Sequence, residues 1–203
     1  MSNRSIHTLL KNWDEECPLT REEAVEVLSL PEEEMDSLME CAYALRTKYK
    51  GKKVSVQLLT NVRSGNCTQN CAYCAQSKDS QAEIEKYKRV SDEKLYGDND
   101  LVDEKHLARH CIGLSGIGFS DEEIEDLADR IREMKKKDTQ ICCSIGFLTE
   151  KQARILKDAG LDRINHNLNS SRSFYPEICT THTYDQRVNN IKMLQSLGFE
   201  ICS

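Results

Sequence analysis

The residues best suited to chemistry in this sequence are three cysteines that lie close together in "NCTQNCAYCAQ", residues 66–76. Cys67, Cys71 and Cys74 follow the spacing C-x3-C-x2-C. Clustered cysteine thiolates bind zinc or iron–sulfur clusters, and a closed site of either kind usually takes about four ligands. The spacing therefore predicts a metal or cluster site. Either its fourth ligand comes from elsewhere in the chain, or one metal position is left open.

The cysteine content also indicates the environment of the protein. The chain has ten cysteines among 203 residues. Its first residues lack the apolar segment of a secretory signal peptide, so clustered thiols indicate metal or redox chemistry rather than a disulfide framework. No apolar run approaches the roughly 18 residues of a membrane span, and the net charge is −6 with no basic patch. We therefore expect a cytoplasmic protein that binds neither a membrane nor a nucleic acid.

The elements that must position these cysteines divide the sequence into two regions. Residues 1–50 predict helices, because Thr20 and Glu23 form a capping box and Pro31 stands before a run of acids at a helix start. From Gly51 onward, short β-type segments alternate with helical segments. The expected domains are an N-terminal helical extension over 1–50 and an α/β core over 51–203.

The α/β core follows a regular strand and helix alternation. Strands are predicted over 53–61, 109–115, 140–147, 161–168 and 199–203. Helices with capping boxes are predicted over 120–137, 149–160 and 183–198. A first crossover helix belongs in 85–108, where "LYGDNDLVDEKH" interrupts the helical pattern. This rhythm predicts βαβ units and a parallel sheet.

Two parallel architectures fit the alternation, a doubly wound sheet and a (β/α)8 barrel. Neither GxGxxG nor GxxxxGK[ST] occurs in the sequence, so a nucleotide-binding sheet lacks its fingerprint. A complete barrel takes about 250 residues, and the visible βα units make up about half of one. The sequence stops at Ser203 inside a predicted strand. We therefore expect a fragment truncated at its C-terminal end.

Three further cysteines fall on separate predicted strands. Cys111, Cys142 and Cys202 lie within the second, third and fifth strand segments. They could converge inside a barrel, or each could be a small buried hydrophobic residue. Cys143 follows Cys142 directly and must point to the opposite face, so it is expected to pack in the core. Cys179 carries no predicted role.

The segment "RINHNLN" places three amides at the end of the fourth predicted strand. Asn165, Asn167 and Asn169 alternate with His166 and Leu168. A period of two would put the three amides on one strand face, where they are costly unless they hydrogen-bond a partner. A ligand-binding strand end and an asparagine-rich turn are the two interpretations.

The cysteine spacing, with Tyr73 before the last cysteine, resembles the cluster motif of radical S-adenosylmethionine enzymes. The wider sequence resembles the biotin synthase family within them. The matching segments are "LTREEAVEVL", "NVRSGNCTQNCAYCAQS", "RHCIG", "DRINHNLNSS", "TTHTYDQRV" and "GFEICS". The resemblance runs from about residue 18 to the end and implies the first half of a (β/α) barrel of the TIM type, preceded by the N-terminal helices.

The resemblance also implies a role for particular residues. It implies a [4Fe–4S] cluster held by Cys67, Cys71 and Cys74, and a [2Fe–2S] cluster held by Cys111, Cys142 and Cys202 with an arginine on a later strand that this chain does not contain. It implies S-adenosylmethionine contacts from Tyr73, Asn167, Asn169 and Arg187, and substrate contacts from Asn165 and Asn167. Position 169 is often Asp in the family, but Asn can also bond ribose hydroxyls. Arg187 alternatively belongs to a solvated helix face.

The function implied by the resemblance is sulfur insertion into dethiobiotin to give biotin, through a 5′-deoxyadenosyl radical. The implied cofactors are the two clusters and S-adenosylmethionine. The implied partners are dethiobiotin, an electron donor such as a flavodoxin or a ferredoxin, and a second copy in a homodimer of the full-length protein.

Three alternatives stay open at the level of sequence. The chain could be another radical enzyme of the biotin-synthase-like group with a different substrate. It could be a zinc- or cluster-binding module without enzymatic activity, although no fourth cysteine or histidine lies near the motif. It could also be an inactive fragment, because half a barrel exposes a sheet edge and apolar surface.

Overall fold

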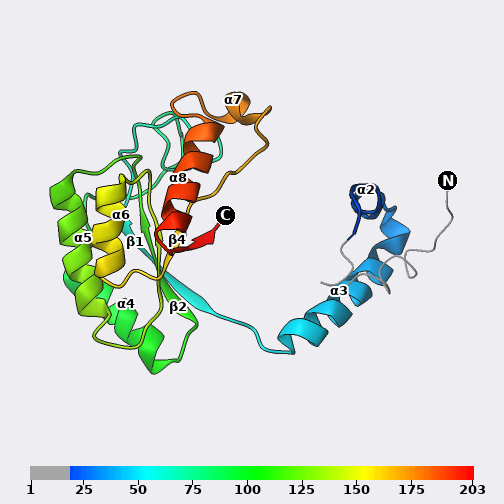
Figure 1. The fold of residues 1–203 in the computed structure, drawn as a ribbon, viewed down its shortest axis with the longest axis horizontal. Helices are drawn as coiled ribbons and strands as arrows, with labels where there is room; N and C mark the ends of the chain where they lie inside the picture. The colour runs from blue at the N-terminus through cyan, green and yellow to red at the C-terminus, as the bar shows by residue number, and fades with distance from the viewer. Residues whose placement is uncertain (1–18) are drawn as a thin grey trace. The chain divides into compact units, whose positions relative to one another are not determined.

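The computed structural model describes residues 19–203, which form two compact units divided between Val54 and Ser55 (Figure 1). The beginning of the predicted N-terminal extension therefore lies outside the described residues. Within the described residues no helix is long and apolar enough to cross a membrane.

The N-terminal unit is helical. It contains α2 (Arg21–Leu28), the 3-10 helix η1 (Glu32–Glu34) and α3 (Met35–Lys50). The predicted capping box is confirmed, because Thr20 Oγ1 accepts a hydrogen bond from the Glu23 backbone at 3.2 Å and the Glu23 carboxylate accepts one from the Thr20 backbone at 2.9 Å. Pro31 precedes the 3-10 turn rather than opening α3 directly. None of the residues in these three helices is buried.

The larger unit is built on a five-stranded parallel sheet. The strands are β1 (Gln57–Arg63), β2 (Arg109–Leu114), β3 (Ile141–Ser144), β4 (Arg163–Asn165) and β5 (Glu200–Cys202). They lie side by side in their sequence order, β1-β2-β3-β4-β5. A doubly wound sheet reverses its strand order at a switch point, whereas a barrel adds each strand next to the preceding one. The observed order is that of the barrel and confirms a parallel α/β fold.

Helices connect the strands as crossovers. They are α4 (Asp92–Glu104), α5 (Asp121–Met134), α6 (Glu150–Asp158) and α8 (Tyr184–Ser196), with a short α7 (Tyr175–Ile178) that the sequence did not predict. Helices α5 and α6 lie side by side along the sheet (Figure 1). The predicted interruption of the first crossover helix is wrong, because α4 runs through "LYGDND" without a break. Its buried Leu95 and Val102 pack in the core, and that tertiary contact outweighs the poor helix propensity of the glycine and aspartates.

The core lies between the helices and the helix-facing side of the sheet. Alternate strand residues such as Ile112, Ile141 and Ile164 are buried there against Ile124 and Ile131 of α5. Cys143 is completely buried in this cluster, as predicted for a packing residue. Because side chains alternate along a strand, the neighbouring Cys142 lies on the other face. The second face of the sheet is therefore free to carry the site.

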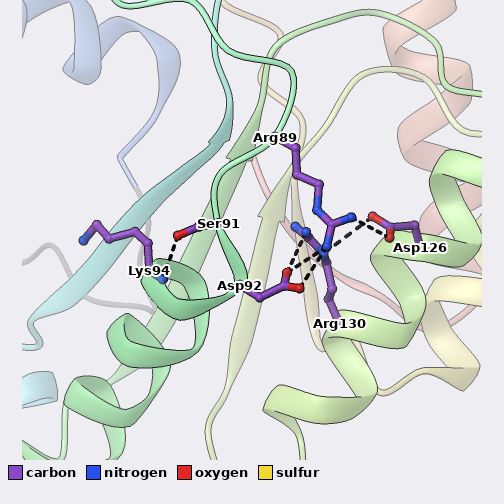
Figure 2. A network of polar contacts seen from close by, with 6 residues as sticks. All are labelled: Arg89, Ser91, Asp92, Lys94, Asp126 and Arg130. Carbon is purple, nitrogen blue, oxygen red and sulfur yellow. Dashed lines mark hydrogen bonds and ion pairs between the residues drawn. The ribbon is translucent and has the colours of Figure 1, made fainter.

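A network of four charged side chains joins the start of α4 to α5. Asp92 accepts from Arg89 at 2.8 Å and lies 2.7 Å from Arg130, while Asp126 lies 3.2 Å from Arg89 and 3.5 Å from Arg130. Figure 2 shows these four side chains together with the cap of α4, in which Ser91 accepts from the backbone of Lys94. The Arg130 side chain is 4% exposed and the two aspartates are about half exposed. The network therefore anchors a nearly buried guanidinium.

Replacing Arg130 with methionine should lower the free energy of unfolding. Removing one partner of a fully buried ion pair costs about 3–5 kcal/mol. Since water screens the two aspartates, we expect a loss of about 1–3 kcal/mol here. Urea unfolding followed by circular dichroism measures it. The matched control on the same helix is Arg132→Met, whose exposed pair with Asp129 should contribute less than about 1 kcal/mol; equal losses in both variants would contradict this role of the network.

Candidate functional site

The face of the sheet opposite the helices is lined with polar side chains and thiols in two layers. Cys111 is paired with Leu59 and Cys142, and Cys142 is paired with Arg163. One layer nearer the C-terminal strand ends lie Asn61, Gly113, Ser144, Asn165 and Cys202, which are also neighbours across the sheet. Active sites of parallel barrels lie at the C-terminal ends of the strands. The outer of the two layers therefore lies next to the C-terminal strand ends, where the active site is expected.

A cavity of about 540 Å³ opens at these strand ends. All three cysteines of the motif line it: Cys67, Cys71 and Cys74. The structure brings Tyr73, Asn165, Asn167, Asn169 and Arg187 to the same cavity. Every residue predicted for the [4Fe–4S] site, for S-adenosylmethionine and for the substrate thus lies around one space. Cys111, Cys142 and Cys202 do not line it.

The cysteine loop is fastened to the end of α7 and to the segment that follows it. The backbone of Ala72 donates to Ile178 O at 2.9 Å. The side chain of Asn70 donates to Thr180 Oγ1 at 2.6 Å and accepts from the backbone of Thr180 at 3.0 Å and of Thr181 at 3.3 Å. These contacts join segments about 110 residues apart in sequence. Asn70 therefore holds the loop that carries the motif.

Replacing Asn70 with alanine should loosen this loop. The variant loses side-chain hydrogen bonds to four groups, because the Thr181 hydroxyl also donates to Asn70 Oδ1 at 3.1 Å. Their loss is expected to reduce the protection of nearby amides by at least roughly tenfold, since each net bond contributes about 0.5–1.5 kcal/mol. Hydrogen exchange at 68–74 and 178–182 measures the effect. Gln81→Ala is the control, because this exposed amide lies further along the same segment and, within residues 19–203, its side chain hydrogen-bonds only Asp79 O, at 3.4 Å. Unchanged exchange in Asn70→Ala would contradict the proposed fastening.

The three asparagines reach the cavity by a route that differs from the prediction. Strand β4 ends at Asn165, so the expected continuation of a period-two strand to 168 is wrong. Asn169 lies in the left-handed region with φ 65°, and its side chain donates to the Tyr73 hydroxyl at 2.7 Å. Oδ1 of Asn165 is buried and has no hydrogen-bond partner within residues 19–203. A buried carbonyl without a partner favours the ligand-binding interpretation over a simple turn.

Arg187 lies inside this network rather than on a solvated helix face. Its guanidinium donates to the Tyr175 hydroxyl at 2.6 Å, to Asn167 O at 3.1 Å and to His182 Nε2 at 2.9 Å. Burial, aided by the neighbouring Arg187 charge, lowers the pKa of His182 to about 4, so the imidazole is neutral near pH 7. A fixed arginine beside a cavity suits a carboxylate ligand.

The sequence did not predict Cys179, His182 and Gln69 as part of the site. Cys179 Sγ lies 3.7 Å from Cys71 Sγ and 3.3 Å from His182 Nδ1, and Gln69 Oε1 lies 3.0 Å from that nitrogen. Burial, together with Cys179, raises the pKa of Cys71 to about 11. The only sequence signal was the pair of cysteine and histidine three residues apart in "CTTH".

The second set of thiols lies on the inner face of the sheet, with Cys111 and Cys142 one layer deeper than Cys202. Cys111 and Cys142 are direct neighbours on adjacent strands, and Cys202 is paired with Asn165 on β4. Burial, reinforced by Cys111, raises the pKa of the Cys142 thiol to about 12, and Arg163 acts in the opposite direction. Arg163 is held by Glu200 through contacts of 2.7 and 2.9 Å. Three thiols beside a fixed cation could hold a metal cluster of negative charge.

Comparison with known proteins gives close relatives among biotin synthases. The chain is 39% identical to the biotin synthase of Geobacillus kaustophilus and 40% identical to that of Bacillus subtilis strain 168, in each case over 91% of the chain. It spans 56% of the length of either relative.

Solved structures share the fold. Methylornithine synthase superposes with a TM-score of 0.81 at 16% identity, over 95% of this chain and 56% of that structure. The FeFe-hydrogenase maturase from Carboxydothermus hydrogenoformans superposes with a TM-score of 0.79 at 20% identity, over 97% of this chain and 47% of that structure.

The family model of the radical S-adenosylmethionine superfamily matches residues 61–203. This range includes the cysteine loop and the cavity residues Asn165, Asn167, Asn169 and Arg187. Membership implies a [4Fe–4S] cluster and S-adenosylmethionine as cofactors. With the cysteine motif at the carboxyl ends of a parallel sheet whose strands follow barrel order, the chain belongs to the radical S-adenosylmethionine superfamily.

Proposed function

We propose that this chain forms the cofactor-binding part of a biotin synthase, which inserts sulfur into dethiobiotin. The observation that carries the proposal is the second set of thiols, Cys111, Cys142 and Cys202, on the same inner sheet face as the motif cavity. A radical enzyme that only abstracts hydrogen has no need for three further thiols there. The similarity to biotin synthases supports the same conclusion.

The first cluster fits the motif cavity. Cys67, Cys71 and Cys74 offer three thiolates, and the cavity of about 540 Å³ leaves room for a ligand at the remaining iron. Thiolate is the ligand class that iron–sulfur clusters take. The fourth position would be held by the amino and carboxylate groups of S-adenosylmethionine, which answers why the motif has three cysteines.

S-adenosylmethionine and the substrate would share the rest of the cavity. Arg187 would pair with the methionine carboxylate, and Tyr73 would contact the adenosyl group beside Asn169, to which it is already hydrogen-bonded at 2.7 Å. Asn167 and Asn169 would bond the ribose. Asn165, whose buried Oδ1 has no partner within residues 19–203, would accept a hydrogen bond from an N–H of the ureido ring of dethiobiotin, with Asn167 nearby.

The second cluster would be held by Cys111, Cys142 and Cys202, with an arginine from outside this chain as the further ligand. Three thiols on one face of the sheet, on β2, β3 and β5, fit the chemistry of a [2Fe–2S] donor set. Arg163 would remain paired with Glu200 and balance the negative charge of the thiolates. When bound, the [4Fe–4S] cluster supplies the electron that cleaves S-adenosylmethionine to a 5′-deoxyadenosyl radical, and the [2Fe–2S] cluster supplies the sulfur.

The side chains of this chain would bind and orient the cosubstrate and the substrate, and they would exclude water from the site. Arg187 and the asparagines would hold the cosubstrate in one pose, so that its reactive carbon faces the substrate. The cysteine loop, fastened by Asn70, would cover the site. The proposed setting is a cytoplasmic homodimer of the full-length protein that takes electrons from a flavodoxin or a ferredoxin, with residues 1–50 as a helical extension.

Anaerobic reconstitution tests this function. The protein should take up both clusters by iron and sulfide analysis, release 5′-deoxyadenosine under reduction, and convert dethiobiotin to biotin. Retention of one cluster only, with 5′-deoxyadenosine but no biotin, would favour a radical enzyme with a different substrate. Absence of both clusters would overturn the proposal.

A further inference from the structure

Two buried thiols lie in contact at the edge of the motif cavity, and the proposed function uses only one of them. Cys71 and Cys179 have their sulfur atoms 3.7 Å apart, although they are separated by 108 positions in sequence. Cys71 comes from the cysteine loop, and Cys179 directly follows α7. Both are free and pack in the same small core with Tyr175.

The two thiols can be reached from different sides. Cys71 lines the motif cavity, and Cys179 lines a second cavity of about 340 Å³ together with Tyr175, His182 and Thr183. Cys179 Sγ is held by contacts of 3.5 Å to Thr181 Oγ1 and 3.3 Å to His182 Nδ1. A small oxidant therefore has access to a pair of sulfurs that are already in contact.

We propose that Cys71 and Cys179 form a reversible disulfide when the cluster site is empty. In the first step, one thiol reduces hydrogen peroxide, becoming a sulfenic acid and releasing one water. In the second, the other thiol attacks that sulfur, and the hydroxyl leaves with the thiol proton as a second water. The two sulfurs together lose two electrons, which reduce one peroxide. A disulfide is about 2.04 Å long, so rotation of the side chains must bring the sulfurs about 1.7 Å closer.

The disulfide would give the chain a protected resting form. While bonded to Cys179, Cys71 cannot bind iron, and it also cannot proceed to sulfinic or sulfonic acid, which are not reversed by simple thiols. A dithiol reductant restores both thiols by exchange. Cluster assembly would then depend on reduction of this bond. The formation of the bond itself does not depend on the biotin synthase assignment.

Peptide mapping tests the proposal. The chain is stripped of iron with a chelator, treated with one equivalent of hydrogen peroxide, alkylated and digested with trypsin. Cleavage after Arg63, Lys78, Arg172 and Arg187 releases 64–78 and 173–187. We expect these two peptides joined through Cys71 and Cys179, and separated by dithiothreitol. A bond from Cys71 to Cys67 or Cys74, or separate overoxidation of Cys71 and Cys179, would overturn the proposal.

Variants provide a second, independent measurement. Cys179→Val should lose the joined peptide, and its Cys71 should accumulate sulfinic and sulfonic acid, so that dithiothreitol no longer restores cluster uptake after oxidation. Cys41→Ser, in the N-terminal unit, is the control and should retain both the joined peptide and the recovery. If the oxidised Cys179→Val protein recovers as fully as the control, the protective role is wrong. The mapping of the unsubstituted chain stands even if Cys179→Val fails to fold, and it needs neither biotin formation nor a cluster.

A metal ion bound by Cys71, Cys179 and His182 is the alternative to the disulfide. Cys71, Cys179 and His182 have ligand atoms within 4.8 Å of one another, so zinc could occupy the trio. Arg187, however, donates to His182 Nε2 at 2.9 Å, which places a positive charge against that site. Adding zinc after chelation is therefore part of the test. Zinc bound at one equivalent that blocks formation of the joined peptide would replace the disulfide by a metal site and overturn the proposal.

Discussion

Replacing Cys74 with alanine should abolish assembly of the [4Fe–4S] cluster and, with it, cleavage of S-adenosylmethionine. Cys74 lines the motif cavity and is partly buried against Cys71. With two thiolates left, the cluster loses a third of its protein ligands. Substituting a residue that only hydrogen-bonds a metal ligand lowers metal affinity or activity by about 10–100-fold. Removing a ligand itself should therefore lower cluster content and 5′-deoxyadenosine release by more than roughly 100-fold. Iron content, visible absorbance and 5′-deoxyadenosine release after anaerobic reconstitution measure the effect.

Cys74 is a better target than Cys71 for this experiment. A variant at Cys71 leaves Cys179 within reach of the vacated position, because the two sulfurs lie 3.7 Å apart. The matched control is Cys41→Ala, a half-buried thiol in the N-terminal unit, which should retain full iron and full 5′-deoxyadenosine release. Full cluster content in Cys74→Ala would contradict the ligand assignment, and equal losses in both variants would indicate unfolding.

Local features of the sequence were enough to predict the framework. The capping boxes that begin at Ser120, Thr149 and Thr183 are all present, because each depends on residues within one helical turn. The opposite orientation of Cys142 and Cys143 follows from strand geometry alone and agrees with complete burial of Cys143. Strand order was not accessible from the alternation alone, since a doubly wound sheet and a barrel both fit it, and only the resemblance implied the barrel order.

Contacts between distant segments could not be predicted in the same way. The packing of Cys179 on Cys71 and the fastening of Asn70 to Thr180 join residues more than 100 positions apart, and no local pattern encodes them. The course of the chain after Asn165 was also missed. There a left-handed Asn169 and a bond to Tyr73, rather than strand pairing, bring the amides to the cavity. The residue types indicated which side chains could bind a ligand, whereas the contacts that bring these side chains together depend on tertiary structure.

Replacing Cys142 with alanine should separate the two halves of the proposed reaction. Cys142 lies on the inner face of β3 beside Cys111, outside the motif cavity. Its loss should remove the [2Fe–2S] cluster, so iron in the reconstituted protein falls from about six to about four per chain. The first cluster remains, and 5′-deoxyadenosine release should persist. Biotin formation should fall by at least roughly 100-fold, because the sulfur source is gone.

The neighbouring residue supplies a control on the same strand. Cys143→Ala removes a completely buried sulfur from the helix-facing core and should cost about 1 kcal/mol of stability. It should leave both clusters and biotin formation intact, because its side chain lies on the opposite face of the sheet. If Cys142→Ala retains six irons and normal biotin formation, the second set of thiols is structural. That result would contradict the assignment of Cys111, Cys142 and Cys202 as the ligands of a second cluster.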